Sequence, residues 1–121
     1  MPTEIKIDGN YAIENSSYLI VLTVYDELGQ EVVPKTGTWS LTDPAGATIN
    51  GRAAVAIPAL AATMAVLLKG DDLALSVGFT GVSEKRHFLF QGTYDSAYGS
   101  DNPLNDEFIF PVVNLAKIKA T

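Results

Sequence analysis

Three stretches of β-forming residues in this chain each end in an aspartate with a glycine three or four residues further on. The three turns are residues 26–29, 43–46 and 95–99, and the second also carries Pro44. An aspartate at the first position of a type I turn accepts hydrogen bonds from the backbone ahead of it, and a glycine at the end takes a positive φ at little cost. This spacing is typical of hairpin loops, so the sequence predicts strand, turn and strand throughout.

Alternation of apolar and polar residues predicts the strands themselves. No window shows a sustained helical period, apart from one turn capped by an aspartate at 71–73. Residues 18–25 are apolar on both faces, as expected of a strand that is covered on both sides. We therefore predict about seven strands, at 4–7, 18–25, 30–43, 48–57, 63–68, 84–94 and 107–113, with an edge or a kink at Pro34.

The aromatic residues of the predicted strands mostly share one face. Phe88, Phe90 and Tyr94 alternate with polar residues along their strand. We expect the single tryptophan, Trp39, to be buried against four phenylalanines, namely Phe88, Phe90, Phe108 and Phe110. The aromatic residues that fall outside this inward pattern are Tyr11, Tyr18, Tyr25, Phe79 and Tyr98.

Composition excludes several classes of function. The chain is interpreted as one domain, residues 1–121, with eight Lys and Arg against fourteen Asp and Glu and a net charge of −6. Its largest basic cluster is the pair Lys85 and Arg86, which disfavours binding to nucleic acid or to an anionic membrane. The absence of cysteine removes disulfides, Cys nucleophiles and Cys-ligated metals. No secretory signal is visible, so we expect a protein that is cytoplasmic on synthesis.

Residues 53–68 form an almost wholly apolar segment between Arg52 and Lys69. The segment is shorter than the ~20 residues that span a membrane, and Pro58 interrupts it. It is better explained as two buried strands joined by an alanine-rich connection. Because this segment and the strand at 18–25 together carry more apolar surface than one face of a small sandwich hides, we expect a homo-oligomer or a docking subunit with Pro58, Leu60 and Met64 at the interface.

Candidate catalytic and metal sites are sparse. His87 is the only histidine, and a catalytic triad or a zinc site needs partners that the chain does not supply. Residues 95–107 concentrate the oxygen ligands that calcium prefers, but turn formation explains most of them without a metal. A glycosidase pair of carboxylates needs a cleft, which a compact sandwich rarely offers. We expect no enzymatic activity, no cofactor and no metal.

The loop around Tyr98 is the candidate ligand site. Its residues are Asp95, Tyr98, Asp101 and Asn102. An aromatic ring beside carboxylate and carboxamide groups suits sugar binding, because the ring stacks on a pyranose while the polar groups bond its hydroxyls. The alternative function is therefore a carbohydrate-binding module for a surface glycan, although in the simpler interpretation Tyr98 covers its own loop.

A single tryptophan on the third strand, seven short strands and no helix resemble the immunoglobulin-like (fibronectin III-like) antiparallel sandwich. Trp39 lies where such folds place their core tryptophan. Two features depart from the pattern. The chain has no cysteine pair for Trp39 to pack against, and Tyr94 falls late in its strand, not at the start where the tyrosine corner of the fold lies.

Sequence patterns in the second half are similar to those of small Ig-like proteins encoded among the structural genes of tailed bacteriophages and prophages. They are GDDLAL at 70–75, RHFLFQGTYDS at 86–96, NPLNDEFIF at 102–110 and VNL at 113–115. The resemblance spans roughly residues 35–115. It implies a virion or assembly component that works through contacts with itself or with other virion proteins and has no catalytic residues.

Overall fold

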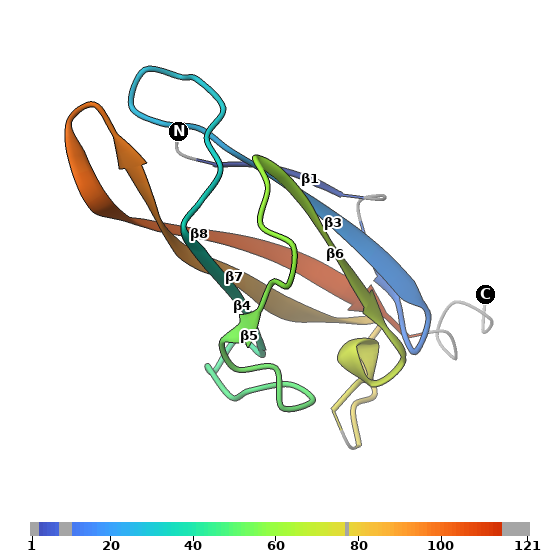
Figure 1. Cartoon of the computed structure of the whole chain (residues 1–121). Coiled ribbons are helices and arrows are strands. Elements are labelled where there is room, and N and C mark those ends of the chain that lie inside the picture. The colour runs from blue at the N-terminus through green and yellow to red at the C-terminus, as the bar shows by residue number, and fades with distance from the viewer. Residues whose placement is uncertain (1–2, 8–10, 77, 115–121) are drawn as a thin grey trace.

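The chain folds into two β-sheets in the computed structural model, which describes residues 3–7, 11–76 and 78–114 (Figure 1). The prediction of an all-β fold is confirmed. Among the described residues, no helix has the length and hydropathy needed to cross a membrane. The elements are β1 (Thr3–Ile7), β2 (Ala12–Ile13), β3 (Ser17–Val24), β4 (Thr36–Thr42), β5 (Val55–Ala56), β6 (Thr63–Lys69), the 3₁₀ turn η1 (Gly70–Leu73), β7 (Ser83–Ser96) and β8 (Gly99–Val113).

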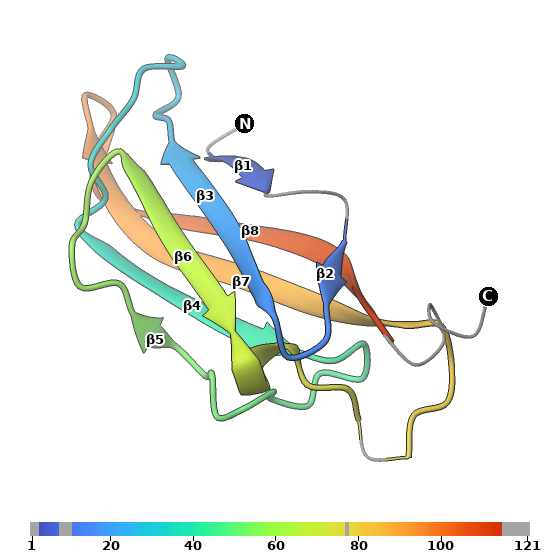
Figure 2. The ribbon, with the colours of Figure 1, turned by 90° about the vertical axis from the view of Figure 1, so that its right-hand side faces the viewer.

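The two sheets lie face to face, with β3 and β6 in front of β7 and β4 in the view of Figure 2. The smaller sheet has the strand order β1-β3-β6, and the larger has the order β2-β8-β7-β4-β5. All neighbouring strands are antiparallel except the short parallel pair of β2 with β8. The side chains that point inward from the two sheets form one hydrophobic core.

The predicted aromatic core is present around Trp39. This side chain is only 7% exposed and stacks on Phe88, with ring centroids 5.7 Å apart. Phe90 lies opposite Trp39 in the register of β4 and β7 and is fully buried. Phe110 is also fully buried, and Phe108 is partly buried and stacked on it.

Tyr18 lies in the core, although its sequence pattern predicted a position outside it. It is 1% exposed and stacks on Phe110 at 4.9 Å. β3 alternates buried positions with half-buried ones such as Leu19 and Val21. Because both faces of this strand are apolar, its sequence does not reveal which face points inward.

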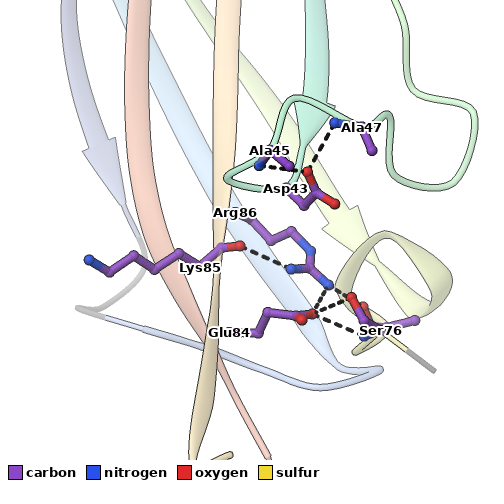
Figure 3. A network of polar contacts seen from close by, with 8 residues as sticks. Asp43, Ala45, Ala47, Ser76, Glu84, Lys85 and Arg86 are labelled. Carbon is purple, nitrogen blue, oxygen red and sulfur yellow. Dashed lines mark hydrogen bonds and ion pairs between the residues drawn. The ribbon is translucent and has the colours of Figure 1, made fainter. Parts of the chain in front are cut away.

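The turn after β3 confirms the predicted aspartate cap. Asp26 accepts hydrogen bonds through Oδ1 from the N–H groups of Leu28 and Gln30, at 2.9 and 3.0 Å. Gly29 closes the turn with a φ of 77°. The turn at 43–46 repeats the arrangement residue by residue, as the contacts of Asp43 in Figure 3 show.

The third predicted turn forms a hairpin, but Asp95 does not cap it. Ser96 does so instead, because its Oγ accepts a hydrogen bond from the N–H of Tyr98 at 3.2 Å. The carboxylate of Asp95 accepts the N–H of Asp101 across the hairpin, at 2.8 Å. Asp101 takes a φ of 53°, and Gly99 is not among the described glycines with positive φ. The local aspartate–glycine spacing was therefore misleading here.

The predicted strand at 48–57 is largely wrong. Only Val55–Ala56 pairs there, together with an isolated bridge between Thr42 and Thr48. Asn50, Gly51 and Ala54 have φ values of 52°, 66° and 49°, which lie outside the β region. The segment is therefore mostly a loop.

β8 begins at Gly99, eight residues before the predicted start at 107. Residues 101–106 are mostly turn-forming, so the sequence of this stretch does not predict a strand, yet the stretch pairs with β7 along its length. Pro103 is tolerated because β2 covers β8 only at residues 112 and 113, which leaves β8 as an edge strand at this point.

We predict that Trp39→Ala lowers the free energy of unfolding by roughly 3–5 kcal/mol, because it leaves a cavity beside Phe88. Tyr98→Ala removes an exposed ring and is the control, with an expected change below about 0.5 kcal/mol. Urea unfolding followed by circular dichroism measures both. Similar losses in the two variants would contradict the core assignment.

Candidate functional site

A buried arginine marks one end of the two-sheet core. Arg86 lies on the inward face of β7, in the same row as Phe88 and Phe90, and is fully buried. Its guanidinium donates hydrogen bonds to the carbonyl oxygens of Lys85 and Ala74, both at 2.9 Å. It also forms an ion pair with Glu84 (Figure 3). Arg86 is one half of the basic pair noted in the sequence, and its parity with Phe88 is the signal that places it inside.

Glu84 connects this arginine to the segment that follows η1. Its Oε1 accepts hydrogen bonds from the backbone N–H and the Oγ of Ser76, both at 2.9 Å. Burial alone would raise the pKa of Glu84, but the hydrogen bonds from Ser76 and Arg86 outweigh it and hold the pKa below its ordinary value. Glu84 is therefore ionised and neutralises Arg86. Nε of Arg86 is the one buried side-chain nitrogen or oxygen of the described residues without a hydrogen-bond partner.

A fully buried carboxylate lies in η1, where the sequence predicted an aspartate-capped turn. Asp72 is 1% exposed and accepts hydrogen bonds from Arg52 Nε at 2.7 Å, Asn50 Nδ2 at 2.9 Å and the N–H of Lys69 at 3.2 Å. Burial would raise the pKa of Asp72, but these bonds outweigh it and lower the pKa. The guanidinium of Arg52 also lies 5.5 Å from the ring centroid of Trp39, which links the turn to the core.

An open depression of about 320 Å³ lies between the loop 48–50 and the segment 71–76, and Asn50, which donates to Asp72, is part of its lining. Arg86 and Ser76 contribute to its lining. Both side chains are engaged by Glu84, and Asp72 is engaged by Arg52. The polar groups described at this end hold the chain segments together, and Glu84, which accepts the hydrogen bond from Ser76 Oγ, is already paired with Arg86.

His87 lies on the opposite, outward face of β7, as the alternation predicted. Its Nδ1 is 3.5 Å from Oε2 of Glu107 on β8, and a quarter of the side chain is exposed. The pair is a cross-strand contact on the sheet surface. Cross-strand pairs of this kind stabilise a sheet modestly.

The acidic candidate loop at the end of the β7–β8 hairpin is paired with a cation from the connection between β3 and β4. Lys35 Nζ lies 2.6 Å from Oδ1 of Asp101 and 3.4 Å from Oδ1 of Asp95. Asp106, which the sequence grouped with them, lies further along β8 opposite Phe90. Within the described ranges, no group of three or more His, Cys, Asp or Glu side chains could hold a metal ion.

A second contact joins the loop 26–35 to the same hairpin. Glu27 accepts hydrogen bonds from the hydroxyl of Tyr94 at 2.7 Å and from Oγ of Ser96 at 3.1 Å. The hydrogen bond from Tyr94 is the main cause of the lowered pKa of Glu27, and the same bond raises the pKa of Tyr94. Together with Lys35, this contact braces the hairpin end, and the sequence analysis did not anticipate it.

The candidate ligand residues are brought together, but most of their polar groups are already used. The amide of Asn102 donates to Oγ of Ser96 at 3.3 Å and to the carbonyl of Gly99 at 3.1 Å. Asp95 and Asp101 are engaged by Lys35. The ring of Tyr98 is 73% exposed and has no role in these contacts, whereas the side chain of Asp101, at 69% exposed, is paired with Lys35.

The three candidate interface residues lie in different environments. Pro58 is exposed, whereas Leu60 is partly buried against the core. Leu60 lies so close to Gly37 that a Cβ atom added at Gly37 would be 2.9 Å from Cδ2 of Leu60. Met64 faces inward from β6 and is 4% exposed, so its side chain is not available to a partner in this structure. An interface through Pro58 and Leu60 stays a prediction.

Comparison with known proteins adds no relative: no family model matches the chain, and neither curated proteins nor solved structures yield a match.

We predict that Asp72→Asn lowers the free energy of unfolding at pH 7 by about 1–3 kcal/mol, because it leaves Arg52 without its charged partner. The pKa of Asp72 in the folded protein is below its ordinary value of 3.8. Its contribution is therefore complete above about pH 4 and is lost as the pH falls through the folded pKa. The free energy of unfolding, measured from pH 7 to pH 2, should fall less steeply toward acid pH in the variant than in the wild type.

The control for this prediction is Asp71→Asn, since Asp71 is the exposed neighbour of Asp72 in the same turn. It should change the free energy of unfolding by less than about 0.5 kcal/mol. An acid profile of Asp72→Asn that parallels the wild type would show that the buried carboxylate is not a source of acid sensitivity.

We also predict that calcium leaves the melting temperature unchanged, because Lys35 occupies the space between Asp95 and Asp101. A ligand that binds only the folded state would raise it. Differential scanning calorimetry in EDTA and in millimolar calcium is the measurement. A rise of several degrees with calcium would restore the metal site at this loop.

Proposed function

We propose that this protein is a non-catalytic structural protein, an Ig-like β-sandwich that acts through protein–protein contacts in a phage or prophage virion or in its assembly. The observation that carries the proposal is how charged and apolar side chains are distributed. The buried charged side chains of Arg86 and Asp72 are held in internal ion pairs, whereas several large apolar side chains are exposed on strands and loops.

Strand order supports the Ig-like assignment. The sheet β1-β3-β6 follows the A-B-E order of such a domain, and the run β8-β7-β4 follows the order G-F-C. In this correspondence Trp39 lies on the equivalent of strand C, where Ig domains carry their buried tryptophan. Tyr94 remains a departure, since it lies late in β7 and bonds Glu27 of a neighbouring loop.

The nature of the exposed groups supports a role in contacts. Leu67 on β6 is 51% exposed and Ile109 on β8 is 47% exposed, and they belong to different sheets. A contiguous exposed apolar patch on a small protein commonly marks an interaction site. Leu67 belongs to such a strip with Ala65, Leu19 and Val21 on the smaller sheet, which suits a component that docks against other subunits.

A carbohydrate-binding module is the second candidate, and the exposure of Tyr98 is the observation that favours it. The neighbouring Asp95, Asp101 and Asn102 bond within the protein, which leaves fewer polar groups for sugar hydroxyls. This candidate therefore ranks below the assembly role. Glycan-array binding that is lost in Tyr98→Ala would reverse the order.

We predict that the protein is present in purified virus-like particles in fixed proportion to the other structural proteins. Quantitative mass spectrometry of density-purified particles, with immunogold labelling, measures this after induction of the host that carries the gene. The phage assignment rests on the sequence resemblance at 70–115, so this is its direct test. A protein that is abundant in the induced lysate but absent from particles and their assembly intermediates would contradict the proposal.

A further inference from the structure

β6 is an edge strand with one side unpaired, because it is hydrogen-bonded to β3 alone among the described strands. The ladder between them is bracketed by the bonds from Val24 N–H to Ala62 O, at 2.9 Å, and from Gly70 N–H to Ser16 O, at 3.0 Å. Backbone groups alternate in direction along an antiparallel strand. The N–H and C=O groups of Thr63, Ala65 and Leu67 therefore point away from β3, along the outer edge of the sheet.

This edge differs from the other exposed sheet edges. β2 and β5 are only two residues long, and the sequence of β1 includes Glu4 and Lys6. The part of β8 that β2 leaves uncovered carries Pro103 together with Asp106 and Glu107. Proteins commonly protect exposed edges by such shortness or by charge, and also by proline or by bulges. From Thr63 to Leu68, β6 has no charged residue, no proline and no irregularity in its register with β3. Its edge is therefore open to another strand.

The outward face beside this edge is apolar. Leu67 is 51% exposed and lies opposite Leu19 in the register of β3 and β6, and Ala65 lies opposite Val21. Leu19 and Val21 are half-buried, and Ala65 is exposed. These residues form a continuous uncharged strip along the sheet, which would be covered further if the sheet continued beyond β6.

We propose that a second copy of this chain covers the edge, with the two β6 strands paired antiparallel about a two-fold axis at Ala65. Each Ala65 then exchanges its N–H and C=O with its counterpart, and Thr63 of each copy does the same with Leu67 of the other. The two three-stranded sheets become one continuous sheet. The inference deepens the proposed function, on which it rests, by naming the partner of one contact surface.

Two properties of the strand favour a copy of the chain over another protein. The outward residues at 63, 65 and 67 are evenly spaced about Ala65, so the edge is complementary to itself, as a two-fold interface requires. The chain also has a net charge of −6, so copies repel one another except where the surface is uncharged. The strip along β6 is such a place.

The test uses proline to remove one outward N–H group. Ala65→Pro leaves the β3–β6 ladder intact, because the N–H of Ala65 faces away from β3, and proline is tolerated on an edge in this orientation. The matched control is Ala56→Pro on β5. Ile57 donates its N–H to Gly37 O of the adjacent β4 at 3.0 Å, so the groups of Ala56 also point outward, but from the other sheet.

Sedimentation velocity and light scattering from micromolar to millimolar concentration give the dimer Kd of the full chain and of each variant. Ala65→Pro should raise the Kd by about tenfold or more, because symmetry removes the bond from both strands. Ala56→Pro should dimerise like the wild type, with the same β circular dichroism in all three proteins.

A wild-type monomer at millimolar concentration, or a dimer that Ala65→Pro leaves unchanged, would overturn the pairing. So would an equal weakening by both proline variants. These outcomes are separate from the particle test, since a monomeric protein found in particles would leave the proposed function standing. A β6-paired dimer absent from particles would leave the pairing standing and remove the function.

Discussion

The need to neutralise Arg86 between the two sheets organises one end of the molecule. Its side chain shares a row with Phe88 and Phe90, so a register that turned Arg86 to solvent would also turn the aromatic row out of the core. The fold keeps the row inside and supplies Glu84 and the carbonyl of Ala74 to the guanidinium. An unpaired charge in that position would cost several kcal/mol. The position of the segment 74–76, which bonds both Arg86 and Glu84, follows from this arrangement.

Features set by neighbouring residues could be predicted from the sequence, and features set by distant pairing could not. The caps at Asp26 and Asp43 and the burial of Trp39 depend on local turn chemistry and on alternation. The early start of β8 at Gly99 depends on pairing with β7, which overrides its turn-forming residues. In the candidate loop, Lys35 meets Asp101 from 66 residues away, and no local pattern signals that contact.

The same arrangement supports the assembly role proposed above. Carboxylates that could serve a site are each paired with a cation: Glu84 with Arg86 on its own strand, and Asp72 and Asp101 with cations from distant segments. The surface that remains is apolar along β6 and acidic elsewhere in net charge. Such a surface discriminates between partners, because uncharged edges can approach one another while the remaining faces repel.

Amide hydrogen exchange at β6 tests most directly whether its free edge is a contact between copies. The account predicts that the N–H groups of Ala65 and Leu67 exchange quickly in dilute solution and become protected as the concentration rises. Those of Met64 and Val66, which face β3, should be protected at every concentration. Exchange at Ala65 and Leu67 that stays equally fast at millimolar concentration would contradict the claim.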